Sequence, residues 1–93
     1  MKYPVIFDQS GRQDKYYTIT FPNFIGLVEK SDSIDGLNGC LKKAREALMN
    51  HLTDYAAQPD IPAPSDLNEV IQANPHAIVT EVEIKLPSHL LHN

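Results

Sequence analysis

The chain has 93 residues, of which 42% are hydrophobic and 22% are charged, and its formal net charge is -4 at pH 7. This composition excludes an intrinsically disordered chain and indicates one small globular domain with a single modest core. The acidic balance argues mildly against nonspecific nucleic-acid binding, which depends on Lys and Arg neutralising phosphates, and it suits a basic partner.

The first third of the chain predicts three strands of an antiparallel meander. Residues 2–7 and 16–21 are rich in β-branched and aromatic side chains, and residues 27–30 form a brief third run. Pro4 lacks an N–H group, so we expect its strand to lie at an edge or to have one unpaired position. Pro22 ends the second strand and begins a tight turn.

A long helix is predicted after these strands. Asp32 or Ser33 supplies a side-chain oxygen that can cap its first turn. Gly36 and Gly39 are poor helix formers, costing ~1 kcal/mol each relative to Ala. They either let the helix approach the sheet closely or, as we expect here, simply weaken its first turns. Apolar residues recur at helical spacing and form one stripe: Ile34, Leu37, Leu41, Ala44, Leu48 and Leu52.

The last third predicts a linker, a short helix and a final strand. Residues 58–65 contain three prolines, which favour an extended and stiff segment. Ser65 can cap a helix over residues 66–73, and residues 77–86 form a strand that we expect to pair with the first one and cover its edge.

Together these elements predict an α+β fold of order βββααβ: a three-stranded antiparallel meander, a long helix, a short helix and a fourth strand. We expect helices on one face of the sheet, where the apolar stripe of the long helix is buried. The predicted domain covers residues 1–86, and residues 87–93 are a short tail.

The sequence contains few signals of its cellular compartment or of redox chemistry. Cys40 is the one cysteine, so no internal disulfide can form, and it lies on or beside the helical stripe as a small buried residue would. No apolar run approaches the ~18 residues of a membrane span, and no signal peptide is recognisable. We therefore expect a cytoplasmic protein without membrane contact.

No catalytic motif is recognisable in the chain, which has no phosphate-binding glycine loop, serine elbow or metal-ligand cluster. We expect neither an enzyme nor a cofactor. One alternative is a metal-dependent nuclease of ribonuclease H type, in which Asp8, Glu46 and either Glu81 or Glu83 would hold two metal ions. Nothing in the sequence indicates that these carboxylates converge.

Four short segments occur in a fixed order along the chain. They are Tyr3-Pro4-Val5-Ile6-Phe7, Phe21-Pro22-Asn23-Phe24-Ile25-Gly26-Leu27, Glu46-Ala47-Leu48 and Ile61-Pro62-Ala63-Pro64-Ser65. In this order and spacing they resemble the HicB antitoxins, and the resemblance runs from about Tyr3 to Ile84. Ile25 and Leu27 depart from it, because Pro and Cys are common at these positions.

The resemblance implies a partial ribonuclease H-like fold without nuclease activity. It also implies binding to a HicA-type toxin, a small basic protein of double-stranded-RNA-binding type that cleaves mRNA through a histidine. An acidic surface would cover the toxin's RNA-binding face, and opposite charges would speed association. The candidate partner-binding residues are the acidic ones expected to be exposed: Asp32, Asp35, Asp54, Asp60, Glu81 and Glu83.

The resemblance further implies a homo-oligomer, either a dimer or a tetramer. Many HicB proteins continue into a DNA-binding domain, but residues 83–91 resemble only the start of a ribbon-helix-helix. That motif needs two full helices per chain, so no direct DNA binding is expected here. The alternative function is a stand-alone oligomeric regulator or scaffold of HicB type that has no toxin partner.

Overall fold

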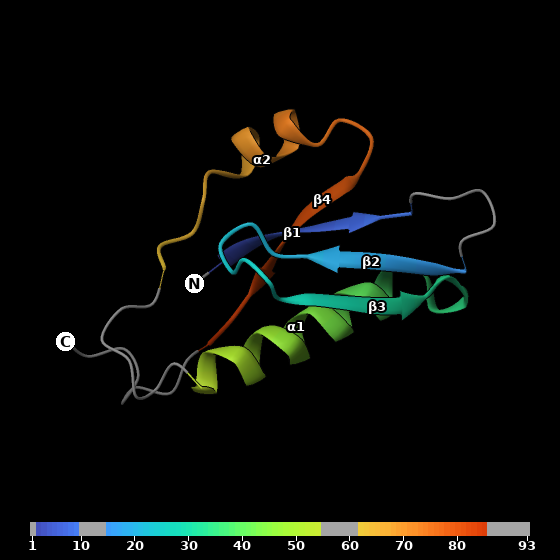
Figure 1. The fold of residues 1–93 in the computed structure, drawn as a ribbon, viewed down its shortest axis with the longest axis horizontal. Coiled ribbons are helices and arrows are strands. Elements are labelled where there is room, and N and C mark those ends of the chain that lie inside the picture. The colour runs from blue at the N-terminus through green and yellow to red at the C-terminus, as the bar shows by residue number, and fades with distance from the viewer. Residues whose placement is uncertain (1, 10–14, 55–61, 86–93) are drawn as a thin grey trace.

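A computed structural model describes residues 2–9, 15–54 and 62–85 of the chain (Figure 1). The predicted tail, residues 87–93, and the first half of the predicted linker lie outside the described residues. The elements in chain order are β1 (Lys2–Asp8), β2 (Tyr16–Thr20), β3 (Val28–Asp32), the 3₁₀ helix η1 (Ser33–Asp35), α1 (Gly36–Asp54), α2 (Leu67–Ala73) and β4 (Ile78–Glu83). The predicted α+β order is therefore confirmed.

The four strands form one antiparallel sheet in the order β3-β2-β1-β4. The predicted pairing of the first and last strands is confirmed, with Lys2 opposite Glu83 and Phe7 opposite Ile78. Pro4 consequently lies in an interior strand. Because the ladder between β1 and β2 covers only positions 6–8 of β1, Pro4 has no strand partner on the β2 side, and a missing N–H is tolerated on such an unpaired side.

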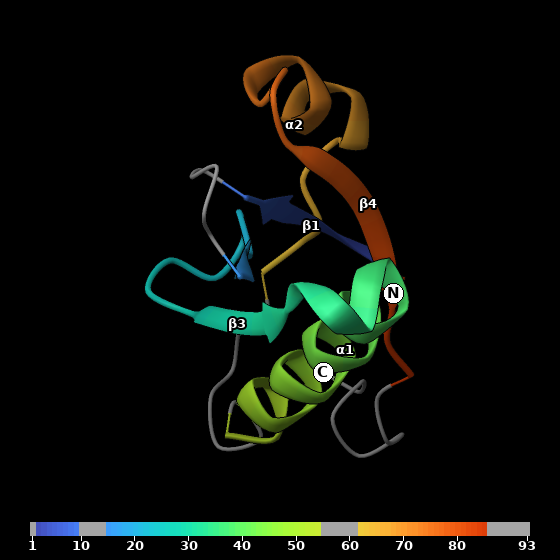
Figure 2. The same cartoon turned by 90° about the vertical axis from the view of Figure 1, so that its right-hand side faces the viewer.

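The two helices lie on opposite sides of the sheet (Figure 2), so the expectation of helices on one face is wrong. Alternation along β1 explains this arrangement. Tyr3, Val5 and Phe7 face α1 and are buried in the core, whereas Ile6 faces the other side and lies near α2. The short α2 buries Val70 over this second face.

The core lies between α1 and the sheet. Its residues on the strands and turn are Tyr3, Val5, Phe7, Ile19, Phe21, Phe24, Val82 and Ile84. Its residues on α1 are Cys40, Ala44, Ala47, Leu48 and Leu52. Of the predicted apolar stripe, Ala44, Leu48 and Leu52 belong to this core, and Leu41 is partly buried against it.

The start of the long helix differs from the prediction. Ile34 is 89% exposed and Leu37 is 44% exposed, because residues 33–35 form the separate helix η1 and Gly36 turns the chain with a φ of 63°. Asp32 caps η1 rather than α1. Residues 34 and 37 therefore do not continue the buried stripe.

Gly39 permits close packing between α1 and β3. A Cβ at this position would overlap Asp35 Cβ and would lie 3.3 Å from Ser31 Oγ. The close-approach interpretation of this glycine is therefore the correct one, and the expectation that it only weakens the helix is wrong. At α2, the cap is Asp66 rather than Ser65, since Asp66 Oδ2 accepts a hydrogen bond from Glu69 N.

Candidate functional site

The acidic residues singled out from the sequence do not gather on one surface. Asp32 and Asp35 are exposed at the end of β3 and in η1. Glu81 and Glu83 are exposed on β4, at the other edge of the sheet. Because β3 and β4 run in opposite directions, the two pairs lie toward opposite corners of the sheet.

The two remaining acidic candidates are not placed. Asp54 is the last residue of α1 and its side chain is outside the described structure, as is the whole of Asp60. Asp32 has a structural role, since its Oδ1 accepts a hydrogen bond of 3.0 Å from Ile34 N. A role in partner binding stays a prediction for all six acidic residues.

The carboxylates of the nuclease alternative lie apart. Asp8 is opposite Thr18 on the β2 side, whereas Glu81 is opposite Pro4, four positions back along β1 and about 13 Å away at the usual rise of a strand. Glu46 is on α1, whereas Glu81 faces away from α1, because its neighbour Val82 on β4 points into the core beneath that helix. Within residues 2–9, 15–54 and 62–85, no group of three or more His, Cys, Asp or Glu could hold a metal ion.

Asn23 joins the β2–β3 turn to the linker that precedes α2. Its Nδ2 donates to Ala63 O at 2.8 Å and to Ser65 Oγ at 3.0 Å, and its Oδ1 accepts from Ser65 N at 3.1 Å. Tyr3 O–H donates to Pro62 O at 2.7 Å. Three of the four segments that carry the family resemblance therefore meet at one place, where they fix the linker and the start of α2.

The turn between β2 and β3 holds Ile25 out into solvent. Phe24 N donates to Phe21 O at 2.9 Å, and Leu27 N donates to Phe24 O at 3.1 Å. Phe21 and Phe24 are buried, and the ring of Phe24 packs edge-on against Tyr3 with centroids 5.0 Å apart. Ile25 lies between Phe24 and Leu27, which the second of these hydrogen bonds joins, and is 100% exposed.

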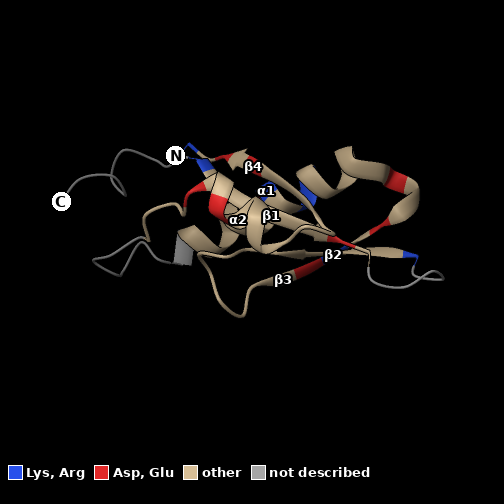
Figure 3. Ribbon diagram, turned by 90° about the horizontal axis from the view of Figure 1, so that it is seen from above, with Lys and Arg blue, Asp and Glu red and all other residues tan. Residues whose placement is uncertain are grey.

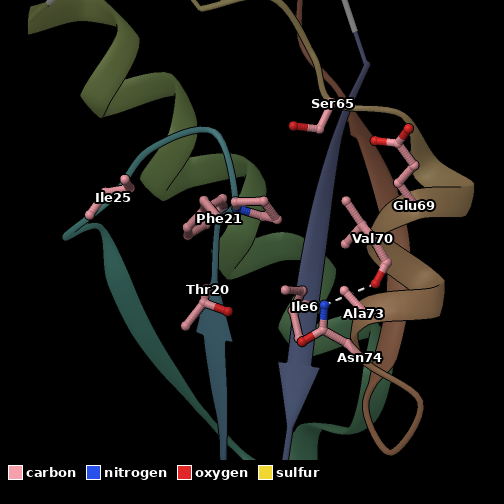
Figure 4. Close-up of a pocket in the computed structure, with 10 residues that line it drawn as sticks. Ile6, Thr20, Phe21, Ile25, Ser65, Glu69, Val70, Ala73 and Asn74 are labelled. Carbon is pink, nitrogen blue, oxygen red and sulfur yellow. Dashed lines mark hydrogen bonds between the residues drawn. The ribbon is translucent and has the colours of Figure 1, made fainter.

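A groove of about 310 Å³ lies between this turn and α2, over the face of the sheet that α1 does not cover (Figure 4). Its floor is formed by the outer-face residues of β1 and β2, and its two walls are the turn and α2. The lining residues are Ile6, Thr20, Phe21, Pro22, Ile25, Ser65, Glu69, Val70, Ala73 and Asn74. Asn74 Nδ2 donates to Val70 O at 2.9 Å and closes the end of α2.

Charge around the groove is of one sign. Glu69 is the charged residue among those that line it, and Asp66 precedes it at the cap of α2. Figure 3 shows acidic residues on α2 and β4, whereas α1 carries both basic and acidic residues. This side of the domain therefore combines an apolar groove with an acidic rim, a combination suited to a partner that has both apolar and basic groups.

A second cavity, of about 470 Å³, lies along the first turns of α1 beside Ser31. Two lysines and two acidic residues line it, so their formal charges balance: Lys42, Lys43, Asp35 and Glu46. Ser31 is 2% exposed, and its hydroxyl has no hydrogen bond of standard geometry among the described residues.

Burial raises the pKa of the nearby Cys40 thiol, and the adjacent Ser31 hydroxyl offsets part of this rise. The cysteine is fully buried in the core, as the sequence predicts. A raised pKa and a buried sulfur both oppose thiolate chemistry.

No protein-family model matches the chain, and no curated protein matches it. Solved structures do match. The N-terminal domain of the Burkholderia pseudomallei antitoxin HicB superposes with a TM-score of 0.72 at 18% identity, covering 92% of this chain and 100% of that domain. The chain has the HicB N-terminal domain fold. The longer Burkholderia pseudomallei HicB structure has a TM-score of 0.75 at 20% identity, and the match covers 92% of this chain and 64% of HicB.

The HicB-like fold confirms the architecture that the four segments imply, and the structure adds residues that sequence reasoning passed over. Asn23 and Ile25 both lie in the second segment. The signal available in the sequence is Ile25 itself, an apolar residue in a tight turn. Among residues 2–9, 15–54 and 62–85, none of the helices is long and apolar enough to cross a membrane.

Proposed function

We propose that this HicB-like domain is an antitoxin module that binds a small basic toxin of HicA type and prevents it from cleaving mRNA. The observation that supports this proposal is the fold, since 92% of the chain superposes on the whole N-terminal domain of a HicB antitoxin. The proposed place of action is the cytoplasm, and the proposed free form is a homo-oligomer.

Neutralisation requires only that the domain cover the toxin's RNA-binding surface. Such a surface is basic because it must neutralise phosphates, and this chain has a formal net charge of -4. Opposite charges raise the association rate and select basic partners, and this contribution weakens with salt because the Debye length falls to ~8 Å at physiological ionic strength.

The test is a reconstitution with a small basic protein of HicA type, which this proposal expects to be encoded beside this gene. Purified toxin should cleave mRNA alone, and an equimolar amount of this domain should abolish cleavage and co-elute with the toxin. Absence of a complex at micromolar concentrations would reject the proposal. The alternative of a stand-alone oligomeric regulator predicts a defined multimer by light scattering and no effect on cleavage.

A further inference from the structure

We propose that the groove between α2 and the β2–β3 turn is the docking surface of this domain, and that it receives an apolar side chain flanked by Lys or Arg on a basic protein partner. This inference rests on the proposed function and assigns it a surface. It differs from the sequence-based candidates, because none of the four that the structure places, Asp32, Asp35, Glu81 and Glu83, lines the groove.

Ile25 is the principal apolar contact. Its side chain is completely exposed on a turn whose neighbours Phe21 and Phe24 are buried, so the exposure is imposed by an ordered backbone. Water contact with an entire isoleucine side chain is unfavourable, and a partner that covers it recovers that free energy. Together with Pro22 and Ala73, Ile25 offers an apolar rim around a concave floor (Figure 4).

The groove is formed before any partner binds. The hydrogen bonds of Asn23 to Ala63 and Ser65 hold the start of α2 at a fixed distance from the turn. The floor belongs to β1 and β2, which are paired through Ile6 and Thr20. A preformed site loses little conformational entropy on binding, and this favours specific recognition over loose hydrophobic contact.

Charge selects a basic partner over a second copy of this chain. Glu69 lines the groove and Asp66 lies one turn before it, whereas no Lys, Arg or His is among the described residues that line it. In a symmetric dimer through this surface, the acidic wall of one chain would face the acidic wall of the other. Each chain also has a net charge of -4, so the two copies would repel each other. A partner with Lys or Arg beside an apolar side chain would match both the acidic wall and the apolar rim of the groove.

The first comparison uses two exposed isoleucines. Ile25→Asp places a charge in the groove, and Ile34→Asp is a matched control because Ile34 is 89% exposed at the start of η1, away from the groove. The probe is the HicA-type protein that the proposed function expects, with its catalytic histidine replaced, and affinity is measured by calorimetry. Ile25→Asp should weaken binding about 10- to 100-fold, and Ile34→Asp should change it less than about 2-fold.

The second comparison uses charge reversal. Glu69→Lys should lower the association rate and reduce its salt dependence, whereas Glu46→Lys, on the exposed side of α1, should leave both unchanged. Thermal melts of all four variants should match the wild type, because each substituted side chain is exposed.

The outcomes separate the two proposals. If the wild type binds and Ile25→Asp binds equally well, or if Ile34→Asp is the variant that loses affinity, the groove is not the docking surface while the antitoxin function stands. If the wild type does not bind, both proposals fail. If Ile25→Asp converts a free multimer into a monomer in light scattering, the occupant is a second copy and the groove proposal is overturned.

Discussion

Asn23 and Ser65 are 42 residues apart in sequence and bind each other through both the backbone and the side chain of the serine. The amide Oδ1 of Asn23 accepts from Ser65 N, while Nδ2 donates to Ser65 Oγ and to Ala63 O. An amide side chain combines an acceptor oxygen with two N–H donors, and all three are used in this contact. The position of α2, and hence one wall of the groove, depends on this contact.

Replacing Asn23 by Ala should destabilise the domain. Ser65 N would lose its acceptor in a partly buried place, which costs about 1–3 kcal/mol in the free energy of unfolding, and the exposed Ala63 O would lose its donor. In a domain of this size each kcal/mol lowers Tm by roughly 4–8 °C, which calorimetry resolves easily. The control is Asn38→Ala, an exposed position on α1 that should not lower Tm. Equal melting of the two variants would contradict the structural role of Asn23.

The hydroxyl of Tyr3 should make stability depend on pH in the alkaline range. Burial raises the pKa of Tyr3 above 10.0 in the folded state, whereas the unfolded chain has the ordinary value. The folded state therefore retains its proton when the unfolded state has lost it, so stability is full below pH 10 and falls as pH rises through the folded-state pKa. Urea titrations between pH 9 and 11 should show this fall.

Tyr3→Phe should remove that part of the pH dependence and also lose the hydrogen bond to Pro62 O, at a cost of about 0.5–1.5 kcal/mol at neutral pH. Tyr16→Phe is the control, since Tyr16 is exposed at the start of β2. A wild-type stability that stays flat to pH 11, or falls equally in Tyr3→Phe, would be inconsistent with a buried and hydrogen-bonded hydroxyl.

Gly39→Ala should destabilise the domain even though Ala is the better helix former by ~1 kcal/mol. The added Cβ would overlap Asp35 Cβ in η1 and would lie 3.3 Å from Ser31 Oγ in β3, so the first turn of α1 would have to shift relative to η1 and β3. We expect a net loss of about 1–3 kcal/mol in the free energy of unfolding, measured with urea. A gain in stability would mean that helix propensity outweighs the packing of α1 against β3.

Two leucines of the predicted helical stripe should differ strongly in their contribution to stability. Leu48 is completely buried, so Leu48→Ala should lower the free energy of unfolding by about 2–5 kcal/mol. Leu37 is 44% exposed, so Leu37→Ala should cost less than about 1 kcal/mol. Chemical denaturation of the two variants decides this, and similar losses would place residue 37 in the core.

Local patterns in the sequence were sufficient to predict the order and type of the secondary-structure elements. The alternation from Tyr16 to Thr20, the helical spacing through Leu48 and the prolines of the linker each act over a few residues, so they can be interpreted without knowledge of distant contacts. The edges of elements were less accurate, because Gly36 and the cap at Asp32 divide what appears in sequence as one helical pattern.

The candidate site could not be predicted in the same way. Acidic residues were chosen because charge and expected exposure are visible in sequence, but β3 and β4 place them toward opposite corners of the sheet. The groove instead combines residues from β1, the β2–β3 turn and α2, which are separated by tens of residues. No periodicity connects Ile25 with Ala73.

The sequence alone determined the α+β order, the single core and the resemblance to HicB antitoxins, because these depend on local propensity, burial patterns and short motifs. Only the tertiary structure decided that α2 lies on the face opposite α1, and that Asn23 rather than a run of charges organises the proposed binding side. The physical reason is that both features depend on contacts between segments distant in sequence, whose geometry exists only once the sheet has formed.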